Sequence, residues 1–366
     1  MGLRPSHARA GAACAATTVQ LYIHGCQDFL RTRYYDFRSV AQEVVIMFAM
    51  AVMALSAPTK CTQFYHSALA PSLELSNSGV LMPMLAFGTG SLAAGTAEGA
   101  VRRALVHGVT HIDTAYDYGD QRGVGRALTG VNRTRIFVTT KIPPQSNAST
   151  AFMQSTQAMQ DDLRQLQLSY VDLMLLHNPP KGNTQFCAAM RESWRALMAF
   201  HAAGKTRAIG VSNFCPSSIE CLLSGGDALQ VVVPAINQVE YHLGMTSDPA
   251  GVKSYCDARG IYLQAYSPLD GGNPQLLKGE LVSQIGRAHN VSGAAVSLRW
   301  VYEQCVPFIT TSEQPRHLED DLAVFLNVQA WPLTQADRAA LDVATTPASR
   351  YSHRCTALTP SLRGEV

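Results

Sequence analysis

The feature that most constrains the fold is a regular alternation of short apolar runs with amphipathic stretches after residue 72. In the stretches between the runs, apolar residues recur every three or four positions, which is typical of helices. The predicted strands span residues 85–90, 111–115, 136–142, 171–177, 208–214, 235–241, 261–268 and 306–312. Eight strands that alternate with helices predict an α/β protein whose parallel sheet closes into a (β/α)8 TIM barrel.

The chain divides into three predicted parts. Residues 1–71 lack the alternation and contain an apolar run, Val44–Ala57, that is too short to cross a bilayer as a helix. We expect this part to be a targeting-like or disordered N-terminal extension. Residues 72–345 are predicted to form one barrel domain that begins with a hairpin around Ser78-Gly79, and residues 346–366 a tail near the substrate mouth.

Composition excludes several classes of protein. The content of 47% hydrophobic and 15% charged residues favours a large core over disorder, and the formal net charge of +2 without a long basic run argues against nucleic-acid binding. The nine cysteines are scattered, odd in number and without a CxxC pair. This predicts reduced thiols, with no metal site and no disulfide framework.

We expect a cytoplasmic monomer without a stable membrane span. The alternative is organelle or secretory targeting by the N-terminal extension. Asn132, Asn147 and Asn290 begin glycosylation sequons, which matter only on the secretory path.

Polar groups stand at the ends of seven predicted strands. They are Asp113, Lys141, His177, Ser212-Asn213, Gln238, Tyr266-Ser267 and Ser312. Each has a plain alternative: Lys141 could extend to the rim, His177 could be a hydrogen-bonded core residue, and Asn213 could cap the next helix. Because the strand ends of a parallel barrel converge on one face, the set together predicts an active site there.

Longer motifs identify a family. Residues 72 to about 345 resemble an aldo-keto reductase in MPMLAFGTG, HIDTAYDYGDQRGVGRAL, FVTTK, SYVDLMLLHNP, GKTRAIGVSNF, PAINQVEYH and LQAYSPL, in the expected order. The resemblance implies a catalytic tetrad of Asp113, Tyr118, Lys141 and His177. It also implies nicotinamide contacts from Ser212, Asn213, Gln238 and Tyr266, and pyrophosphate contacts from Ser267 and Leu269.

The chemistry of carbonyl reduction suits these residue types. Negative charge develops on the substrate oxygen as hydride reaches the carbon, so a proton donor must face that oxygen. We expect Tyr118 to be this general acid, with Lys141 as an ammonium neighbour that lowers the phenol pKa. Asp113 would keep Lys141 protonated, and His177 would orient the substrate oxygen. The expected substrates are small-molecule carbonyl compounds, either aldehydes or small ketones.

The adenosine end departs from the family pattern. Thr311, His317 and Asp321 stand where the family carries lysine, arginine and asparagine, so two cations expected at a 2′-phosphate are missing. Ser312 and Arg316 remain as candidate contacts. We expect NADPH as the cofactor, with NADH as the alternative.

The substrate side also departs from the family. Asn178 stands where many relatives have tryptophan, which predicts an open, polar mouth. Tyr116 or Tyr241 could line this mouth, although Tyr241 could equally be a packing residue.

Two other functions stay open from the sequence. The first is a cofactor-sensing regulatory subunit on the same fold. The second is a Schiff-base lyase that uses Lys141, because barrel enzymes of that kind carry a strand-end lysine.

Overall fold

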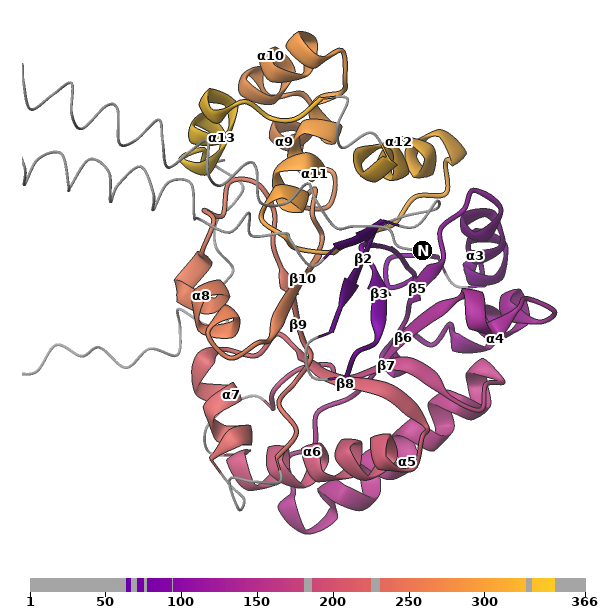
Figure 1. The fold of residues 1–366 in the computed structure, drawn as a ribbon. Helices are drawn as coiled ribbons and strands as arrows, with labels where there is room; N and C mark the ends of the chain where they lie inside the picture. The colour runs from indigo at the N-terminus through magenta and orange to yellow at the C-terminus, as the bar shows by residue number, and fades with distance from the viewer. Residues whose placement is uncertain are drawn as a thin grey trace, which may run out of the picture. The chain divides into compact units, whose positions relative to one another are not determined.

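A computed structural model describes residues 64–66, 71–75, 78–93, 95–180, 186–224, 231–326 and 331–345. Eight strands form a closed parallel barrel in the order β10-β11-β4-β5-β6-β7-β8-β9, with β9 paired to β10 (Figure 1). They are β4 (Leu85–Gly88), β5 (His111–Asp113), β6 (Phe137–Ile142), β7 (Val171–Leu176), β8 (Thr206–Ser212), β9 (Ile236–Glu240), β10 (Tyr262–Tyr266) and β11 (Phe308–Thr310). The predicted (β/α)8 barrel is confirmed.

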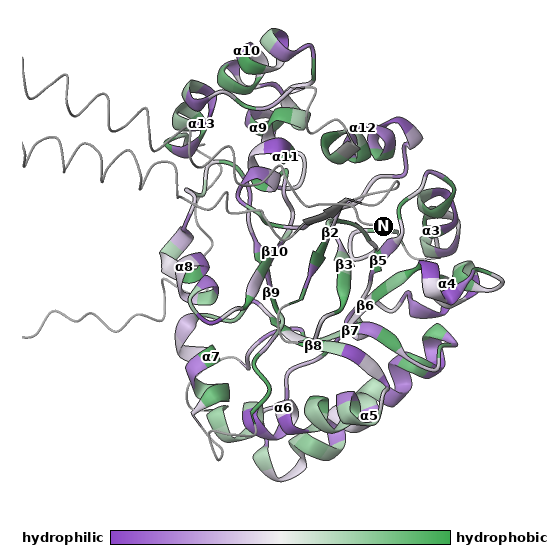
Figure 2. Ribbon diagram, in the orientation of Figure 1, coloured by the Kyte–Doolittle hydropathy of each residue, from purple (hydrophilic) through white to green (hydrophobic). Residues whose placement is uncertain are grey.

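Helices surround the strands (Figure 1). They are α3 (Ala97–Val106), α4 (Gln121–Leu128), α5 (Ala148–Leu166), α6 (Cys187–Ala202), α7 (Pro216–Leu223), α8 (Val252–Asp257), α9 (Pro274–Lys278), α10 (Glu280–His289), α11 (Gly293–Glu303), α12 (Pro315–Leu326) and α13 (Gln335–Asp342). Hydrophobic and hydrophilic residues alternate along them, as expected for helices with one face on a sheet (Figure 2). Every residue of β6 and β7 is buried, including the polar residues Thr139, Thr140 and Lys141 of β6 and Asp172 of β7. No helix among the described residues is long and apolar enough to cross a membrane.

A small antiparallel sheet precedes the barrel. It contains β1 (Phe64–His66), β2 (Pro71–Glu74) and β3 (Leu81–Pro83), and the turn between β2 and β3 contains Gly79 in the left-handed region. The predicted hairpin is therefore present. The run Val44–Ala57 and the tail 346–366 lie outside the described residues, so the three-part division of the chain stays a prediction.

The prediction of reduced thiols without disulfides is wrong for the described part of the chain. Cys187 at the start of α6 is bonded to Cys221 in α7, with their Cα atoms 5.5 Å apart. Cys215 and Cys305 are also disulfide-bonded, and the free thiol among the described residues is the buried Cys256. These two cysteines are 34 positions apart in the sequence and meet because α6 packs on α7. The spacing of the cysteines alone does not reveal this packing. Disulfides are typical of oxidising compartments, so this finding weighs against the expected cytoplasmic location.

Candidate active site

Four polar side chains meet where β5, β6 and β7 end. Asp113 is the last residue of β5, Lys141 lies near the end of β6, and His177 follows β7 directly. Tyr118 ends the short 3-10 helix η1 (Tyr116–Tyr118) that follows β5. Neighbouring strands place the first two side by side, because Asp113 pairs with Thr139, two residues before Lys141.

The amine of Lys141 is the centre of this group. Its Nζ donates hydrogen bonds to Oδ1 of Asp113 at 2.5 Å and to the carbonyl oxygen of Thr114 at 2.9 Å. It lies 3.3 Å from the hydroxyl oxygen of Tyr118. The side chain of Lys141 is fully buried and that of Asp113 is 3% exposed, so the pair is shielded from water. A buried ammonium is stable only when it is paired and hydrogen-bonded, and this one is both.

Burial and charge act against each other on the pKa of each group. Burial works to lower the pKa of Lys141, but Asp113 and Tyr118 outweigh it, so that pKa is raised and the amine stays charged. For Tyr118, burial raises the pKa and Lys141 lowers it. Lys141 acts in the expected direction, but burial is the larger effect, so the net pKa of the phenol is raised. At neutral pH the phenol therefore keeps its proton.

His177 stands beside the phenol. Its ring meets that of Tyr118 edge-on, with centroids 5.6 Å apart. Burial, and then the charge of Lys141, lower the pKa of His177, so the ring is neutral at neutral pH. Its Nδ1 lies 3.4 Å from a carboxylate oxygen of Asp117 and makes no hydrogen bond in the described part of the chain. Because this nitrogen is buried, a substrate oxygen would have to meet the ring at its other nitrogen, Nε2.

Sequence reasoning missed two neighbours of the phenol. One is Asp117, whose position inside η1 gave no signal beyond an ordinary acidic residue. The other is Gly90, where an added Cβ would lie 2.7 Å from Cζ of Tyr118 and 3.0 Å from its hydroxyl oxygen. The phenol thus packs directly against the Gly90 backbone. The glycine-containing run at the end of the first strand was the available signal for this contact.

The residues expected at a nicotinamide form one hydrogen-bonded group. The side chain of Ser212 donates to the carbonyl oxygen of Gln238 at 2.8 Å. Asn213 has a positive φ of 61°, and its Nδ2 donates to the carbonyl oxygen of His177 at 3.1 Å. The Tyr266 hydroxyl donates to Oδ1 of Asn213 at 2.8 Å, which fixes the orientation of the ring. The alternative role of Asn213 as a helix cap is not observed, because the residue before α7 is Cys215.

Gln238 connects this group to the tetrad. Its Nε2 donates to Oδ2 of Asp113 at 2.8 Å and to Oε1 of Gln264 at 3.0 Å. Gln264, which sequence reasoning also missed, is fully buried in β10 and was hidden within an ordinary apolar run.

The donor set fits a nicotinamide cofactor. The amides of Asn213 and Gln238 match the donors and acceptors of a carboxamide, and the half-buried ring of Tyr266 offers a face for stacking. These groups adjoin Asp113 and His177, so the ring they would hold would lie next to the tetrad.

The residues expected at the adenosine end of the cofactor carry fewer positive charges than the family pattern. Ser312 pairs through its hydroxyl with Nδ1 of His317 at 3.0 Å and accepts from the backbone N–H of Gln314. Arg316 is exposed in the first turn of α12. Asp321 is buried, and burial raises its pKa to about 7 although a hydrogen bond with the Thr310 side chain acts to lower it. Its negative charge is therefore partly suppressed near neutral pH. Ser267, at φ 48°, and Leu269 lie in the loop after β10, and their contact with a pyrophosphate stays a prediction.

The two aromatic candidates for the mouth differ in role. Tyr241 is fully buried and stacks on Trp300 at 5.5 Å, so it is a packing residue. Tyr116 lines a pocket of 420 Å³ together with Pro143, Gln145, Met153, Gln154, Gln157, Ala158 and Asp161. None of the tetrad residues lines this pocket, so it is a hollow separate from them.

Comparisons with known proteins show which family the chain resembles. The model of the Aldo/keto reductase family matches residues 84–344. The chain is 34% identical to a glyoxal reductase of Bacillus subtilis over 75% of this chain and 93% of that protein. It is 33% identical to a morphine 6-dehydrogenase of Pseudomonas putida over 75% of this chain and 90% of that protein. Among solved structures, an aldo/keto reductase from Brucella melitensis matches with a TM-score of 0.65 at 29% identity, over 76% of this chain and 99% of that one.

Proposed function

Since the chain belongs to the aldo/keto reductase family of oxidoreductases, we propose that it reduces aldehydes or small ketones to alcohols with a hydride from NADPH. The observation that carries this proposal is the buried contact between the Lys141 ammonium and both the Asp113 carboxylate and the Tyr118 hydroxyl. Family membership supports the small-molecule carbonyl substrate.

Tyr118 is the proposed general acid. Its raised pKa keeps the hydroxyl protonated at neutral pH, so a proton is available when the substrate oxygen becomes negative. When that proton leaves, the phenolate forms 3.3 Å from a buried ammonium, which stabilises it. Lys141 thus favours the product side of the proton transfer, while burial keeps the proton in place beforehand.

His177 and Asp113 are proposed to position the reacting groups. The neutral ring of His177 can hydrogen-bond the substrate oxygen and hold it beside the phenol. Asp113 keeps Lys141 charged through the bond at 2.5 Å. A nicotinamide cofactor supplies the hydride when bound. The polar group of Ser212, Asn213 and Gln238 is proposed to orient its carboxamide.

NADPH is proposed over NADH on the basis of Ser312, Arg316 and Asp321. Ser312 and Arg316 can contact a 2′-phosphate, and burial of Asp321 reduces the repulsion that its carboxylate would otherwise cause. Ser267 and Leu269 are proposed to contact the pyrophosphate. The monomeric state and the compartment stay predictions.

The geometry disfavours the Schiff-base alternative. A nucleophilic lysine must be uncharged, but Asp113 and Tyr118 raise the pKa of Lys141. The amine is also used in three hydrogen bonds.

Substituting Tyr118→Phe tests the proposal. This change removes the hydroxyl and keeps the ring, so kcat with simple aldehydes should fall by about 10²–10⁴-fold while the Kd for NADPH changes little. The first is measured by steady-state oxidation of NADPH and the second by titration of cofactor fluorescence. An active Tyr118→Phe protein would contradict the assignment, and a wild-type protein that binds NADPH without turnover would favour the regulatory-subunit alternative.

A further inference from the structure

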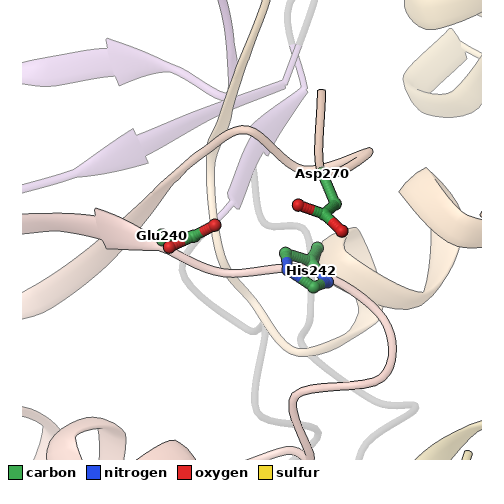
Figure 3. A group of neighbouring side chains, drawn as sticks. All are labelled: Glu240, His242 and Asp270. Atoms are coloured by element: carbon green, nitrogen blue, oxygen red, sulfur yellow. The ribbon is translucent and has the colours of Figure 1, made fainter. Parts of the chain in front are cut away.

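Three metal-ligating side chains meet outside the tetrad, at the carboxyl ends of β9 and β10. Glu240 is the last residue of β9, His242 lies two residues later, and Asp270 lies in the loop after β10. Each offers one ligand atom, and these atoms all lie within 4.8 Å of one another. Figure 3 shows Asp270 reaching from one loop toward His242 on the other, with the Glu240 side chain pointing into the same space.

The hydrogen bond of His242 prepares its ring for a metal. Its Nδ1 lies 2.8 Å from the carbonyl oxygen of Leu243. A carbonyl oxygen only accepts, so Nδ1 is the donor in this bond and Nε2 is the nitrogen left for a metal. Histidines that bind metals are commonly held in this way, with the second nitrogen donating to a backbone carbonyl. The residue is 2% exposed, so its surroundings also restrict the ring.

The carboxylates complete a suitable ligand set. Oδ2 of Asp270 accepts a hydrogen bond from Nδ2 of Asn273 at 2.8 Å, which orients the carboxylate group. Asp270 and Glu240 are both half-buried. Two carboxylates and a neutral imidazole together carry two negative charges, which a divalent cation balances.

We propose that Glu240, His242 and Asp270 bind a divalent transition-metal ion of the zinc type, which joins the loop after β9 to the loop after β10. One imidazole and two carboxylates form a mixed nitrogen and oxygen set that suits Zn²⁺ better than Mg²⁺ or Ca²⁺. Zinc bonds to such ligands are about 2.0–2.2 Å long, so binding draws the three side chains closer together. Three protein ligands leave one coordination position for water.

Calorimetric titration of the metal-stripped full-length chain with Zn²⁺ tests the proposal. The informative variants are His242→Asn and Asp270→Asn. Asparagine places an N–H donor near the position of Nδ1, so His242→Asn can keep the bond to Leu243 while it deletes Nε2. Each variant should raise the Kd of this site for Zn²⁺ by about 100-fold or more. Loss of a residue that only hydrogen-bonds to a metal ligand already weakens binding by up to about 100-fold.

A second histidine–carboxylate pair provides the matched control. Nδ1 of His107 lies 3.1 Å from a carboxylate oxygen of Glu319. His107→Gln removes a surface histidine with one acidic neighbour and should leave the Kd unchanged. Zn²⁺ should also raise the thermal midpoint of the wild type and of this control but not of the two ligand variants, and far-UV circular dichroism verifies that all of them fold.

The metal series completes the test. Zn²⁺ should bind more tightly than Mn²⁺, and Mn²⁺ more tightly than Mg²⁺. Unchanged Zn²⁺ affinity in folded His242→Asn and Asp270→Asn proteins would overturn the proposal. Equal affinity for Mg²⁺ and Zn²⁺ would overturn it as well, since the imidazole would then not be a ligand.

Discussion

Replacing Asp113 with asparagine should reverse the effect of alkaline pH on the stability of the protein. The ammonium of Lys141 lies 2.5 Å from Oδ1 of Asp113, and both side chains are buried. Removing the carboxylate charge leaves a buried ammonium without a counter-charge, which typically costs about 3–5 kcal/mol of the free energy of unfolding. Asparagine also presents an N–H₂ group where the two carboxylate oxygens now accept from Lys141 and Gln238.

The sign follows from the pKa of Lys141 in each protein. In the wild type, burial lowers the pKa of Lys141, but the opposing effect of Asp113 and Tyr118 is larger. The folded pKa therefore lies above the unfolded value. The stabilising contribution is therefore fully present below the unfolded pKa and is lost as pH rises through the folded pKa. In Asp113→Asn, burial acts without the largest opposing charge, so the folded pKa falls below the unfolded value. Stability of the variant should then rise with pH between these two pKa values.

Urea unfolding monitored by tryptophan fluorescence, at pH values from neutral to about 11, measures both curves, because the wild-type loss begins only above the unfolded lysine pKa of about 10.4. Asp172→Asn is the control, because Asp172 is a buried carboxylate paired with Arg133 at 2.6 Å and with Arg207 at 2.8 Å. Guanidinium groups stay charged throughout this range, so this variant should lose stability without a change of slope relative to the wild type. Parallel pH curves for Asp113→Asn and the wild type would refute the reasoning.

Three further predictions concern the phenol, the adenosine end and the disulfide. Gly90→Ala should lower kcat by about 100-fold with little change in the Kd for NADPH, because the new Cβ would lie 2.7 Å from Cζ of Tyr118 and displace the phenol. Steady-state kinetics measure this effect, and an unchanged kcat would contradict it. The preference for NADPH over NADH should weaken as pH rises through about 7, where Asp321 ionises, and Asp321→Asn should abolish that dependence in paired Kd titrations. Replacing Cys187 and Cys221 with alanine should lower the free energy of unfolding by about 3–4 kcal/mol, because the bond closes a loop with a sequence separation of 34 residues. Urea unfolding of the variant and the wild type measures this difference. Equal stability of the two proteins would exclude the bond.

The barrel could be predicted because its signal is local and repeated. The buried strand β7 appears in the sequence as an apolar run interrupted only by Asp172, and the helices between the strands follow from their apolar period. Parallel topology then brings the strand ends to one face, which is why Asp113 and Lys141 could be expected to meet. Their polar identity at the end of an apolar run was the sequence signal.

Other features depend on contacts that no local pattern encodes. The disulfide between Cys187 and Cys221 requires the packing of α6 on α7. The raised pKa of Tyr118 depends on how far burial exceeds the effect of one nearby ammonium, which is a balance of three-dimensional distances. The pKa of Asp321 likewise depends on burial within α12, so in the sequence it read only as an added negative charge.

Asp113 links two parts of the site that the sequence presented as separate. One carboxylate oxygen accepts from Lys141, which contacts the phenol, and the other accepts from Gln238, which belongs to the group proposed to hold the nicotinamide. Since Gln238 also donates to the buried Gln264, this connection extends into β10. The position of the proposed proton donor and that of the proposed hydride donor therefore depend on the same carboxylate. A carboxylate suits this place better than an amide, because it alone accepts on both oxygens while carrying the charge that keeps the amine protonated.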